Sequence, residues 1–476
     1  MLCTIFQLFQ VTEKVQLLNL DATGKTCEHK KFAERSKLRY LQINEAEVVV
    51  GDFKHRLLNL RWLCWQDSPL HFEATNFHTK KLVILDLSGS RIPENWKGWS
   101  QITMASNLKV LDISYTEIRE LPDEIRMLKK LEIIDARGSR LRGIRSLPTS
   151  IHTLGLCVDV EALPELPSSL QVLRVHLWRL HATPNLANLV NLQVLQCYQI
   201  PDNMNQIIFS DIVKLSKLQR LDFGHSNIMT LPKEIDALSQ LKFLNLQPCC
   251  KLRCILGLPP NLVGLYIGGV ESLEILPDLS NLKLLSELWL SGCDKLTKIQ
   301  GLGNLELLES LRIDECYRLT QIQGLGNLVS LASFYMRLCY EIVELDLLEC
   351  SAPLASSEIS GYKHPENKPD RSNLNKLKKI EVIGCQNLNK IEGLHILVSL
   401  EYLNLSYCPS MVRMPNLSNL KMLRHLQLCG CLSLREIEGL EALEALKGLN
   451  IMGCSSLEKV PHLPNTLIYS GDFLPL

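Results

Sequence analysis

The stretch LSELWLSGCDKLTKIQGLGNLEL, residues 285–307, recurs with small changes almost to the end of the 476-residue chain. The next copy, LESLRIDECYRLTQIQGLGNLVS, occupies residues 308–330, so the period is 23 residues. One step, from Leu331 to Leu377, measures 46 residues, which is twice 23. The leading leucines are Leu285, Leu308, Leu331, Leu377, Leu400, Leu423 and Leu446. A fixed period of this length predicts a solenoid, because each unit buries its apolar face only by stacking on its neighbours.

The copies share the internal pattern L-x-x-L-x-L-x-x-C-x-x-L-x-x-I. Alternation at Leu288 and Leu290 predicts a short strand with both side chains turned inward. The later small position is typical of the leucine-rich repeat, which accepts Asn or Cys there. We expect the cysteines at this position to form a structural ladder inside the coil: Cys293, Cys316, Cys339, Cys385, Cys408, Cys431 and Cys454. The predicted fold is an α/β solenoid, a leucine-rich-repeat horseshoe with a parallel concave sheet and short convex helices, 3-10 turns or loops.

Less regular repeats precede the regular ones. They begin at Leu38, Leu60, Leu82, Leu108, Leu131, Ile151, Leu170, Leu192, Leu218, Leu241 and Leu262. We therefore divide the chain into an N-terminal lead-in or cap (1–37), irregular repeats (38–284), regular repeats (285–353), a polar segment (354–376), and regular repeats with the C-terminal end (377–476). The polar segment lacks the leucine register. It is interpreted as an insertion that loops off the coil or as one decayed repeat, and the functional alternative is a recognition loop.

Connections on the convex side differ between repeats. Proline after the strand in Leu121-Pro122 and Leu231-Pro232 predicts a short helix or 3-10 turn, because proline is tolerated at the first helical position. The sequence GLGNL at residues 301–305 predicts a tight turn instead.

Charge and apolar content exclude several classes of partner. The chain has 51 basic and 51 acidic residues, so we expect no nucleic acid and no anionic membrane as partner. No apolar run approaches the roughly 20 residues of a membrane span. The N-terminus carries no basic residues before its apolar stretch and no cleavage site, so no signal peptide is predicted.

The chain contains 17 cysteines. Those in the ladder behave as small buried hydrophobes, which favours a reducing compartment and therefore the cytoplasm, or the nucleus. Cys250 with Cys254 and Cys429 with Cys431 do not supply a four-ligand zinc set, and no metal site is predicted.

Catalytic and cofactor motifs are not found in the sequence. Gly24-Lys25-Thr26 resembles the end of a phosphate loop, but the glycine that opens such a loop is replaced by Asn19. None of the common hydrolase, metalloprotease or dinucleotide signatures is present. We therefore expect no enzyme and no cofactor.

Binding is expected on the concave face, where the third, fifth and seventh residues of each repeat point out of the sheet. Tyrosine, tryptophan and arginine are enriched at the energetic anchors of protein interfaces. The candidate protein-binding residues are Tyr266, Trp289, Arg312, Asp314, Tyr335 and Arg337. The alternative is that these side chains stack on one another and cover the sheet without a partner. For a second row, Asp86, Asp112 and Asp135, we expect only a structural role.

Two stretches carry a resemblance to a known family. KLRYLQINEAEVVVGDF (37–53) and the phrase L-R-W-L-x-W-x-x-x-P from Leu60, followed by NF and LVILDLSGS, resemble the leucine-rich-repeat region of plant nucleotide-binding disease-resistance receptors of the Toll/interleukin-1-receptor-type subclass. The resemblance implies innate immune sensing: the repeats would recognise a pathogen effector or a guarded host protein and hold the receptor inactive until then.

The signalling and nucleotide-binding domains of that family are not found in these residues. ATP or ADP binding is therefore not carried over, and a nucleotide-binding domain becomes an expected partner in cis or in trans. One alternative function is an intracellular leucine-rich-repeat scaffold without an immune role. Another is an extracellular receptor ectodomain, which the sequence disfavours because neither a recurrent G-x-I-P motif nor a signal peptide appears in it.

Overall fold

The computed structural model describes residues 17–21, 26–32, 37–44, 48–66, 71–348 and 373–458. Within 71–348, residues 78, 93–95, 97, 122, 143, 145–146, 159–162, 164, 178–184 and 201–204 are not described. Most of the expected lead-in (1–37) and all but the last four residues of the polar segment (354–376) thus lie outside the described residues. The chain forms two compact units, residues 1–218 and 219–476.

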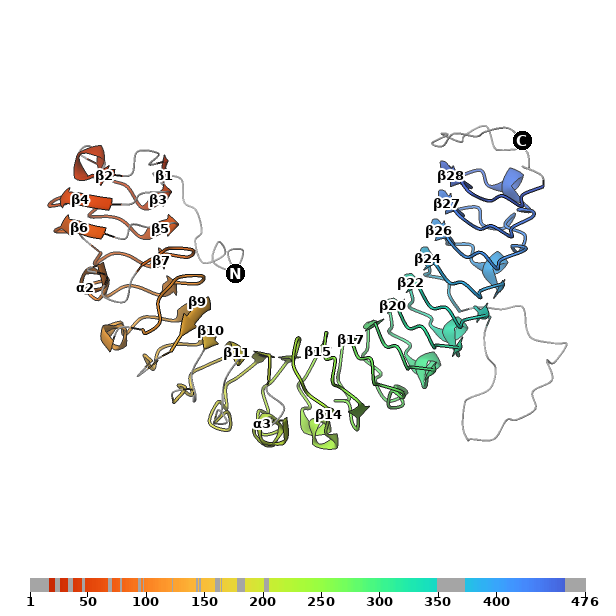
Figure 1. Ribbon diagram of the computed structural model, residues 1–476, viewed down its shortest axis with the longest axis horizontal. Helices are drawn as coiled ribbons and strands as arrows, with labels where there is room; N and C mark the ends of the chain where they lie inside the picture. The colour runs from red at the N-terminus through yellow and green to blue at the C-terminus, as the bar shows by residue number, and fades with distance from the viewer. Residues whose placement is uncertain are drawn as a thin grey trace. The chain divides into compact units, whose positions relative to one another are not determined.

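The first unit is built on a parallel sheet to which each turn of the coil contributes one strand (Figure 1). Its strands are β1 (Leu17–Asp21), β3 (Tyr40–Asn44), β5 (Trp62–Gln66), β7 (Ile84–Asp86), β8 (Val110–Asp112), β9 (Ile133–Leu141), β10 (Thr153–Val158), β11 (Val172–Leu177) and β12 (Val194–Tyr198). Strand β1 pairs with β3, so the lead-in contains a strand of this sheet. A second, smaller parallel sheet consists of β2 (Thr26–Glu28), β4 (Val48–Asp52) and β6 (His71–Thr75).

The second unit has the same construction. Its main strands are β13 (Arg220–Asp222), β15 (Phe243–Leu246), β17 (Gly264–Gly268), β18 (Glu287–Ser291), β20 (Ser310–Asp314), β22 (Ser333–Arg337), β24 (Lys379–Ile383), β26 (Tyr402–Asn404), β27 (His425–Gln427) and β28 (Gly448–Asn450). All of these strands pair in parallel with their neighbours. Short outer pairs are β14 (Thr230–Leu231) with β16 (Cys254–Ile255), β19 (Lys298–Ile299) with β21 (Gln321–Ile322), and β23 (Glu344–Asp346) with β25 (Lys390–Glu392).

The 46-residue step leaves no gap in this sheet. Strand β22 pairs directly with β24, with Tyr335 opposite Glu381. The segment between them therefore places no strand between these two neighbours. The seven regular repeats consequently follow one another in equal steps through the sheet.

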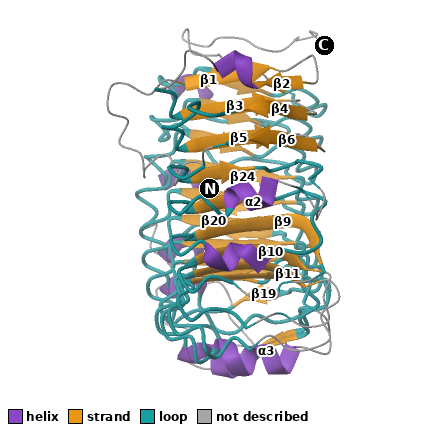
Figure 2. Ribbon diagram, turned by 90° about the vertical axis from the view of Figure 1, so that its left-hand side faces the viewer, coloured by secondary structure: helices purple, strands orange, loops and turns teal. Residues whose placement is uncertain are grey.

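Within the described residues, helical structure is confined to short pieces (Figure 2). They are η1 (His29–Phe32), α2 (Gly98–Ile102), η2 (Asp123–Met127), α3 (Asn205–Ile212), η4 (Lys233–Ala237), η5 (Leu302–Asn304), η6 (Leu325–Asn327), η7 (Leu394–Ile396) and η8 (Leu440–Ala442). The 3-10 turns η2 and η4 lie where the two Leu-Pro motifs predict them. The GLGNL turn contains the single 3-10 turn η5, which follows Gly301 in the left-handed conformation (φ 76°). No helix in the described ranges is long and apolar enough to cross a membrane.

The core lies inside the coil. Strand β18 shows why: Leu288 and Leu290 are fully buried, whereas Trp289 between them faces out, as the two-residue alternation predicts. The leading leucine, here Leu285, is also fully buried. Because the strands are in register, these leucines stack on their counterparts in the next turn, and each turn completes the core of its neighbour.

The ladder cysteines also lie inside the coil. Six of the seven are fully buried, and Cys454 is partly exposed. Cys339 Sγ lies 3.7 Å from the backbone oxygen of Ile313 in the preceding turn, and Cys431 Sγ lies 3.1 Å from that of Leu405. The repeat at Leu241 places Cys249 at the same position, 3.3 Å from the oxygen of Phe223. The spacing from Leu241 could have identified this cysteine, which the sequence analysis omitted.

Candidate protein-binding surface

The predicted aromatic and arginine side chains lie side by side on the concave face of the second unit. Tyr266, Trp289, Arg312 and Tyr335 are register partners on β17, β18, β20 and β22, and Glu381 on β24 continues the row. We call these five residues the central row. Neighbouring strands lie about 4.8 Å apart, so the row forms one continuous strip across five strands.

The first half of the central row is held by aromatic and cation contacts. The rings of Tyr266 and Trp289 meet edge to face, with centroids 5.1 Å apart. The guanidinium carbon of Arg312 lies 5.8 Å from the Trp289 ring centroid, and Arg312 pairs with Asp314. Tyr266 donates a hydrogen bond to Glu287; burial, with the neighbouring Glu287, raises the pKa of Tyr266 to about 12. Trp289 remains 36% exposed and is available to a partner.

The second half is a charged cluster around the buried carboxylate of Glu381. Lys379 Nζ lies 2.8 Å from its Oε1, and Arg337 Nη2 lies 2.7 Å from its Oε2. Lys379 Nζ is also 5.0 Å from the ring centroids of both Tyr335 and Tyr402. Burial opposes ionisation of Glu381, but the two cations outweigh it and lower its pKa.

Two polar atoms of this cluster lack a hydrogen-bond partner among the described residues. They are Asp314 Oδ1 and Arg337 Nε, which are both buried. Asp314 and Arg337 are register partners on neighbouring strands.

The fifth position carries Asp or Asn in seven of the other thirteen repeats, and Gln42, Cys64, Gly155, Arg174, Gln196 and Gln427 occupy it in the remaining six. Asp or Asn at this position accepts a hydrogen bond from the backbone N–H two residues later, which closes the turn after the strand. Such residues are Asp86, Asp112, Asp135, Asp222, Asn245, Asn404 and Asn450. In the second unit the central row interrupts this series in five consecutive repeats, between Asn245 and Asn404. Those five repeats lack the turn-closing side chain and carry Tyr, Trp, Arg, Tyr and Glu in its place. The Glu381 side chain is buried, whereas Trp289 is 36% exposed.

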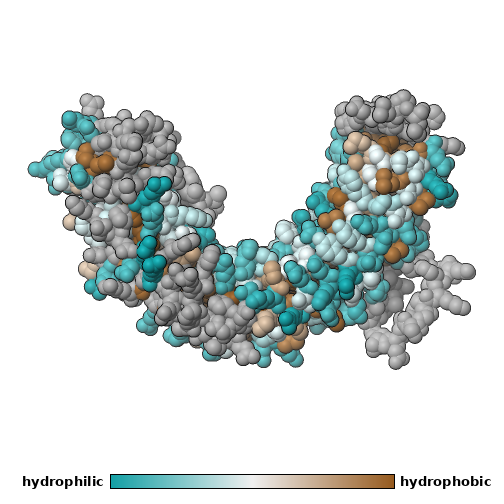
Figure 3. Space-filling model, viewed as in Figure 1, coloured by the Kyte–Doolittle hydropathy of each residue, from teal (hydrophilic) through white to brown (hydrophobic). Residues whose placement is uncertain are grey.

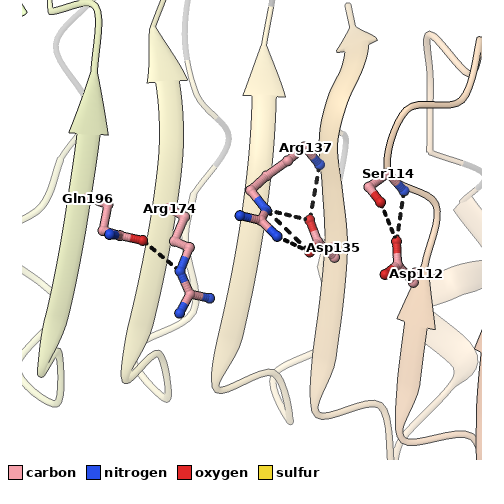
Figure 4. A network of polar contacts seen from close by, with 6 residues as sticks. All are labelled: Asp112, Ser114, Asp135, Arg137, Arg174 and Gln196. Atoms are coloured by element: carbon pink, nitrogen blue, oxygen red, sulfur yellow. Dashed lines mark hydrogen bonds and ion pairs between the residues drawn. The ribbon is translucent and has the colours of Figure 1, made fainter. Parts of the chain in front are cut away.

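The acidic row of the first unit is part of that turn-closing series (Figure 4). Asp112 Oδ1 accepts hydrogen bonds from the Ser114 N–H at 2.9 Å and its hydroxyl at 2.6 Å. Arg137 donates hydrogen bonds to Asp135, from Nε to Oδ1 at 2.9 Å and from Nη2 to Oδ2 at 2.8 Å. Burial, together with the charges of Asp135 and Asp86, raises the pKa of Asp112 to about 6. These contacts give the row a structural role.

The structure brings every predicted binding residue to one surface and adds others. Asp314 and Arg337 flank the row as expected, whereas Lys379, Glu381 and Tyr402 were missed. They occupy the third or fifth position after Leu377 and Leu400, so the repeat pattern marks them as outward-facing. The 46-residue step concealed that they neighbour Tyr335. In the described part of the chain, no cluster of three or more His, Cys, Asp or Glu side chains could hold a metal ion.

Stacked parallel strands, inward leucines and short convex turns together define a leucine-rich-repeat solenoid. No family model matches the chain. Curated proteins that it resembles are plant disease resistance proteins of Arabidopsis thaliana. RRS1B is 25% identical over 309 residues, which cover 57% of this chain and 22% of that protein. RRS1 is 28% identical over 340 residues, covering 60% and 24%. RML1A is 30% identical over 226 residues, covering 46% and 20%.

The chain thus spans a quarter or less of the length of these relatives. Among solved structures, a leucine-rich-repeat protein of Leptospira interrogans superposes with a TM-score of 0.49 at 18% identity, over 87% of this chain and 90% of that one.

Proposed function

We propose that the chain is a protein-binding leucine-rich-repeat domain of plant innate immunity, which recognises a pathogen effector or a guarded host protein through the central row. One observation carries the proposal. Five consecutive repeats replace the turn-closing Asp or Asn by Tyr266, Trp289, Arg312, Tyr335 and Glu381. The similarity to disease resistance proteins supports the immune context.

Within a full-length receptor, the same domain would contribute to autoinhibition by contacting a nucleotide-binding domain in cis or in trans. The domain acts by recognition and not by catalysis. A cytoplasmic or nuclear location is supported by the buried ladder cysteines, which behave as small apolar side chains and suit a reducing compartment.

Binding of the purified chain to a panel of secreted pathogen effectors and host immune proteins tests the proposal. The double variant Trp289→Ala with Arg312→Ala removes the exposed aromatic face and the guanidinium stacked on it. Loss of two anchors is expected to weaken binding by roughly a hundredfold. Tyr198→Ala, which removes a half-buried aromatic on the same face of the first unit, is the matched control and is expected to bind normally.

Thermal unfolding separates the two interpretations of the central row. If the side chains serve binding, the double variant melts close to the wild-type temperature, because Trp289 and Arg312 lie on the concave face, outside the leucine core of the coil. A large loss of thermal stability would assign the row to folding. Unchanged affinity for a partner that the wild-type chain binds would place recognition elsewhere, and binding to scaffold-type host proteins alone would favour the non-immune function.

A further inference from the structure

The polarity of the residues along one edge of the coil changes from the irregular to the regular repeats. We define the leading edge as the two residues that precede each leading leucine. In the irregular repeats the residue directly before that leucine is always polar: Lys37, Asn59, Lys81, Asn107, Lys130, Ser150, Ser169, Asn191, Lys217, Gln240 and Asn261. Several of these residues bond to the preceding turn, with Nζ to Oδ1 distances of 2.7 Å for Lys81 to Asn59 and 2.8 Å for Lys217 to Asn191. Leu58 and Val190 are exposed apolar residues there, and each lies beside an asparagine.

In most of the regular repeats the same edge carries one exposed apolar side chain beside a polar or charged one. The exposed apolar residues are Leu284, Leu307, Val329, Val398 and Met422, whose exposed fractions lie between 39% and 55%. They supply one apolar side chain in each of the repeats at Leu285, Leu308, Leu331, Leu400 and Leu423. Asn375 and Lys376 occupy the edge at Leu377, and Glu444 with the half-buried Ala445 occupies it at Leu446. Figure 3 shows apolar residues at the surface of the second unit among hydrophilic ones. Exposed apolar side chains gathered along one edge in this way indicate a candidate interaction surface.

The charges on this edge are arranged symmetrically about the repeat of Leu377. Because β22 pairs directly with β24, three regular repeats precede that repeat and three follow it in equal steps. A two-fold axis through the repeat of Leu377 would reverse the order of the repeats. This reversal places Lys283 opposite Glu444, and Glu306 opposite Lys421. Both pairs carry opposite charges, and all four residues are exposed.

The apolar residues of the edge match under the same reversal. Leu307 falls opposite Met422, and Val329 falls opposite Val398, so apolar residues meet apolar residues. On the other side of the leading leucine, Glu309 falls opposite Arg424, which is again a pair of opposite charges. The edge is therefore complementary to itself in charge and in hydrophobicity.

We propose that the leading edge of the regular repeats binds the same edge of a second copy of this chain, about a two-fold axis through the repeat of Leu377. A two-fold contact requires a self-complementary patch, which this edge supplies. A second copy also has the same repeat spacing of about 4.8 Å, whereas the turns of a helix, about 5.4 Å apart, would drift out of step. This contact is separate from the central row and does not depend on the proposed function.

The small size of the patch limits the affinity of the dimer. Six steps of about 4.8 Å give a strip about 29 Å long and one or two side chains wide, which is small for a permanent interface. The dimer is therefore weak and depends on concentration. Lys376 lies at the axis and meets its own counterpart, so like charges further limit the affinity.

Sedimentation equilibrium of the full chain across the micromolar range tests the proposal. Wild-type protein should show a reversible monomer–dimer equilibrium. Lys421→Glu places a second carboxylate opposite Glu306 at two symmetric points and should weaken the dimer roughly tenfold or more. Adding Glu306→Lys restores opposite charges and should restore the affinity. Lys376→Met should strengthen the dimer, because it replaces a like-charge meeting by an apolar contact.

Lys80→Glu is the matched control, since Lys80 occupies the equivalent exposed position on the polar edge of the first unit. It should leave the equilibrium unchanged. These are exposed substitutions, and circular dichroism will show that each variant is folded. A wild-type chain that stays monomeric throughout would overturn the proposal. A dimer that Lys421→Glu weakens but the charge swap does not restore would overturn the two-fold arrangement.

Discussion

Ser139 Oγ donates a hydrogen bond of 2.7 Å to the backbone oxygen of Ile113, one turn earlier in the coil. Cys339 Sγ has the same relationship to Ile313, at 3.7 Å. Ser90 bonds to the Trp65 oxygen in the same way, at 2.9 Å. The ladder position therefore needs a small side chain that can donate to a buried carbonyl of the preceding turn. Serine meets this need at Ser90 and Ser139 in the irregular repeats, and cysteine meets it at Cys339, Cys408, Cys431 and Cys454 in the regular ones.

Replacing Cys339 separates packing from hydrogen bonding at the ladder. Cys339→Ala leaves a small cavity and removes the donor to the Ile313 oxygen, so the unfolding free energy should fall by about 1–3 kcal/mol. Cys339→Ser keeps a donor of similar size and should cost less than the alanine variant. Urea unfolding followed by circular dichroism measures both. Equal stability of the alanine variant and the wild type would show that the thiol is dispensable.

The raised pKa of Asp112 makes stability depend on pH. Its folded value of about 6 lies above the unfolded value of about 3.9, so its contribution to stability is greatest below pH 4. That contribution is lost as the pH rises to about 6 and stays lost above it.

Asp112→Asn keeps the acceptor for the Ser114 N–H and removes the charge. The variant should be more stable than wild type above pH 6, by on the order of 2 kcal/mol, and similar below pH 4. Urea midpoints between pH 4 and pH 8 measure the difference. Asp278→Asn is the control, because Asp278 makes the same turn hydrogen bond to Ser280 on the exposed surface. Parallel profiles of wild type and Asp112→Asn would contradict the prediction.

The residue seven positions after the leading leucine adopts the left-handed conformation in most described repeats. These residues are Gly89, Tyr115, Gly138, Gln199, His225, Gly269, Gly292, Glu315, Leu338, Gly384, Tyr407, Gly430 and Gly453. Glu315 is exposed and has a φ of 53°, which is unfavourable for a residue with a Cβ atom. Glu315→Gly should therefore stabilise the fold by up to about 1 kcal/mol.

Replacing a glycine at this position by a residue with a Cβ atom should destabilise the fold. At Gly430 a Cβ atom would lie 2.7 Å from the ring of Tyr407, and φ is 71°. Gly430→Ala should therefore cost about 1–2 kcal/mol or more. Glu341→Gly, at an exposed site without positive φ, controls for the flexibility of glycine and should destabilise slightly. Thermal unfolding ranks the stabilities of the three variants. If Glu341→Gly raised the stability as much as Glu315→Gly, relief of the left-handed backbone conformation would not explain the effect.

The repeat pattern made the strands of the regular repeats predictable from sequence. The alternation around Trp289 requires two inward leucines, because the side chains of a strand alternate between its faces. The 23-residue period then places Trp289, Arg312 and Tyr335 at the same position on successive turns. The structure confirms this register, whereas the use of these side chains for binding stays a prediction.

The sequence alone determined which residues of a repeat face the core, because leucine spacing and strand geometry are local properties. Only the tertiary structure decided which turns are neighbours across the 46-residue step. Lys379 and Glu381 join Tyr335 and Arg337 in one cluster because β22 and β24 bond directly. Strand pairing depends on hydrogen bonds between segments that are distant in the chain. The length of the connection between two strands does not determine whether those strands pair. The same pairing makes the leading edge symmetric about Leu377.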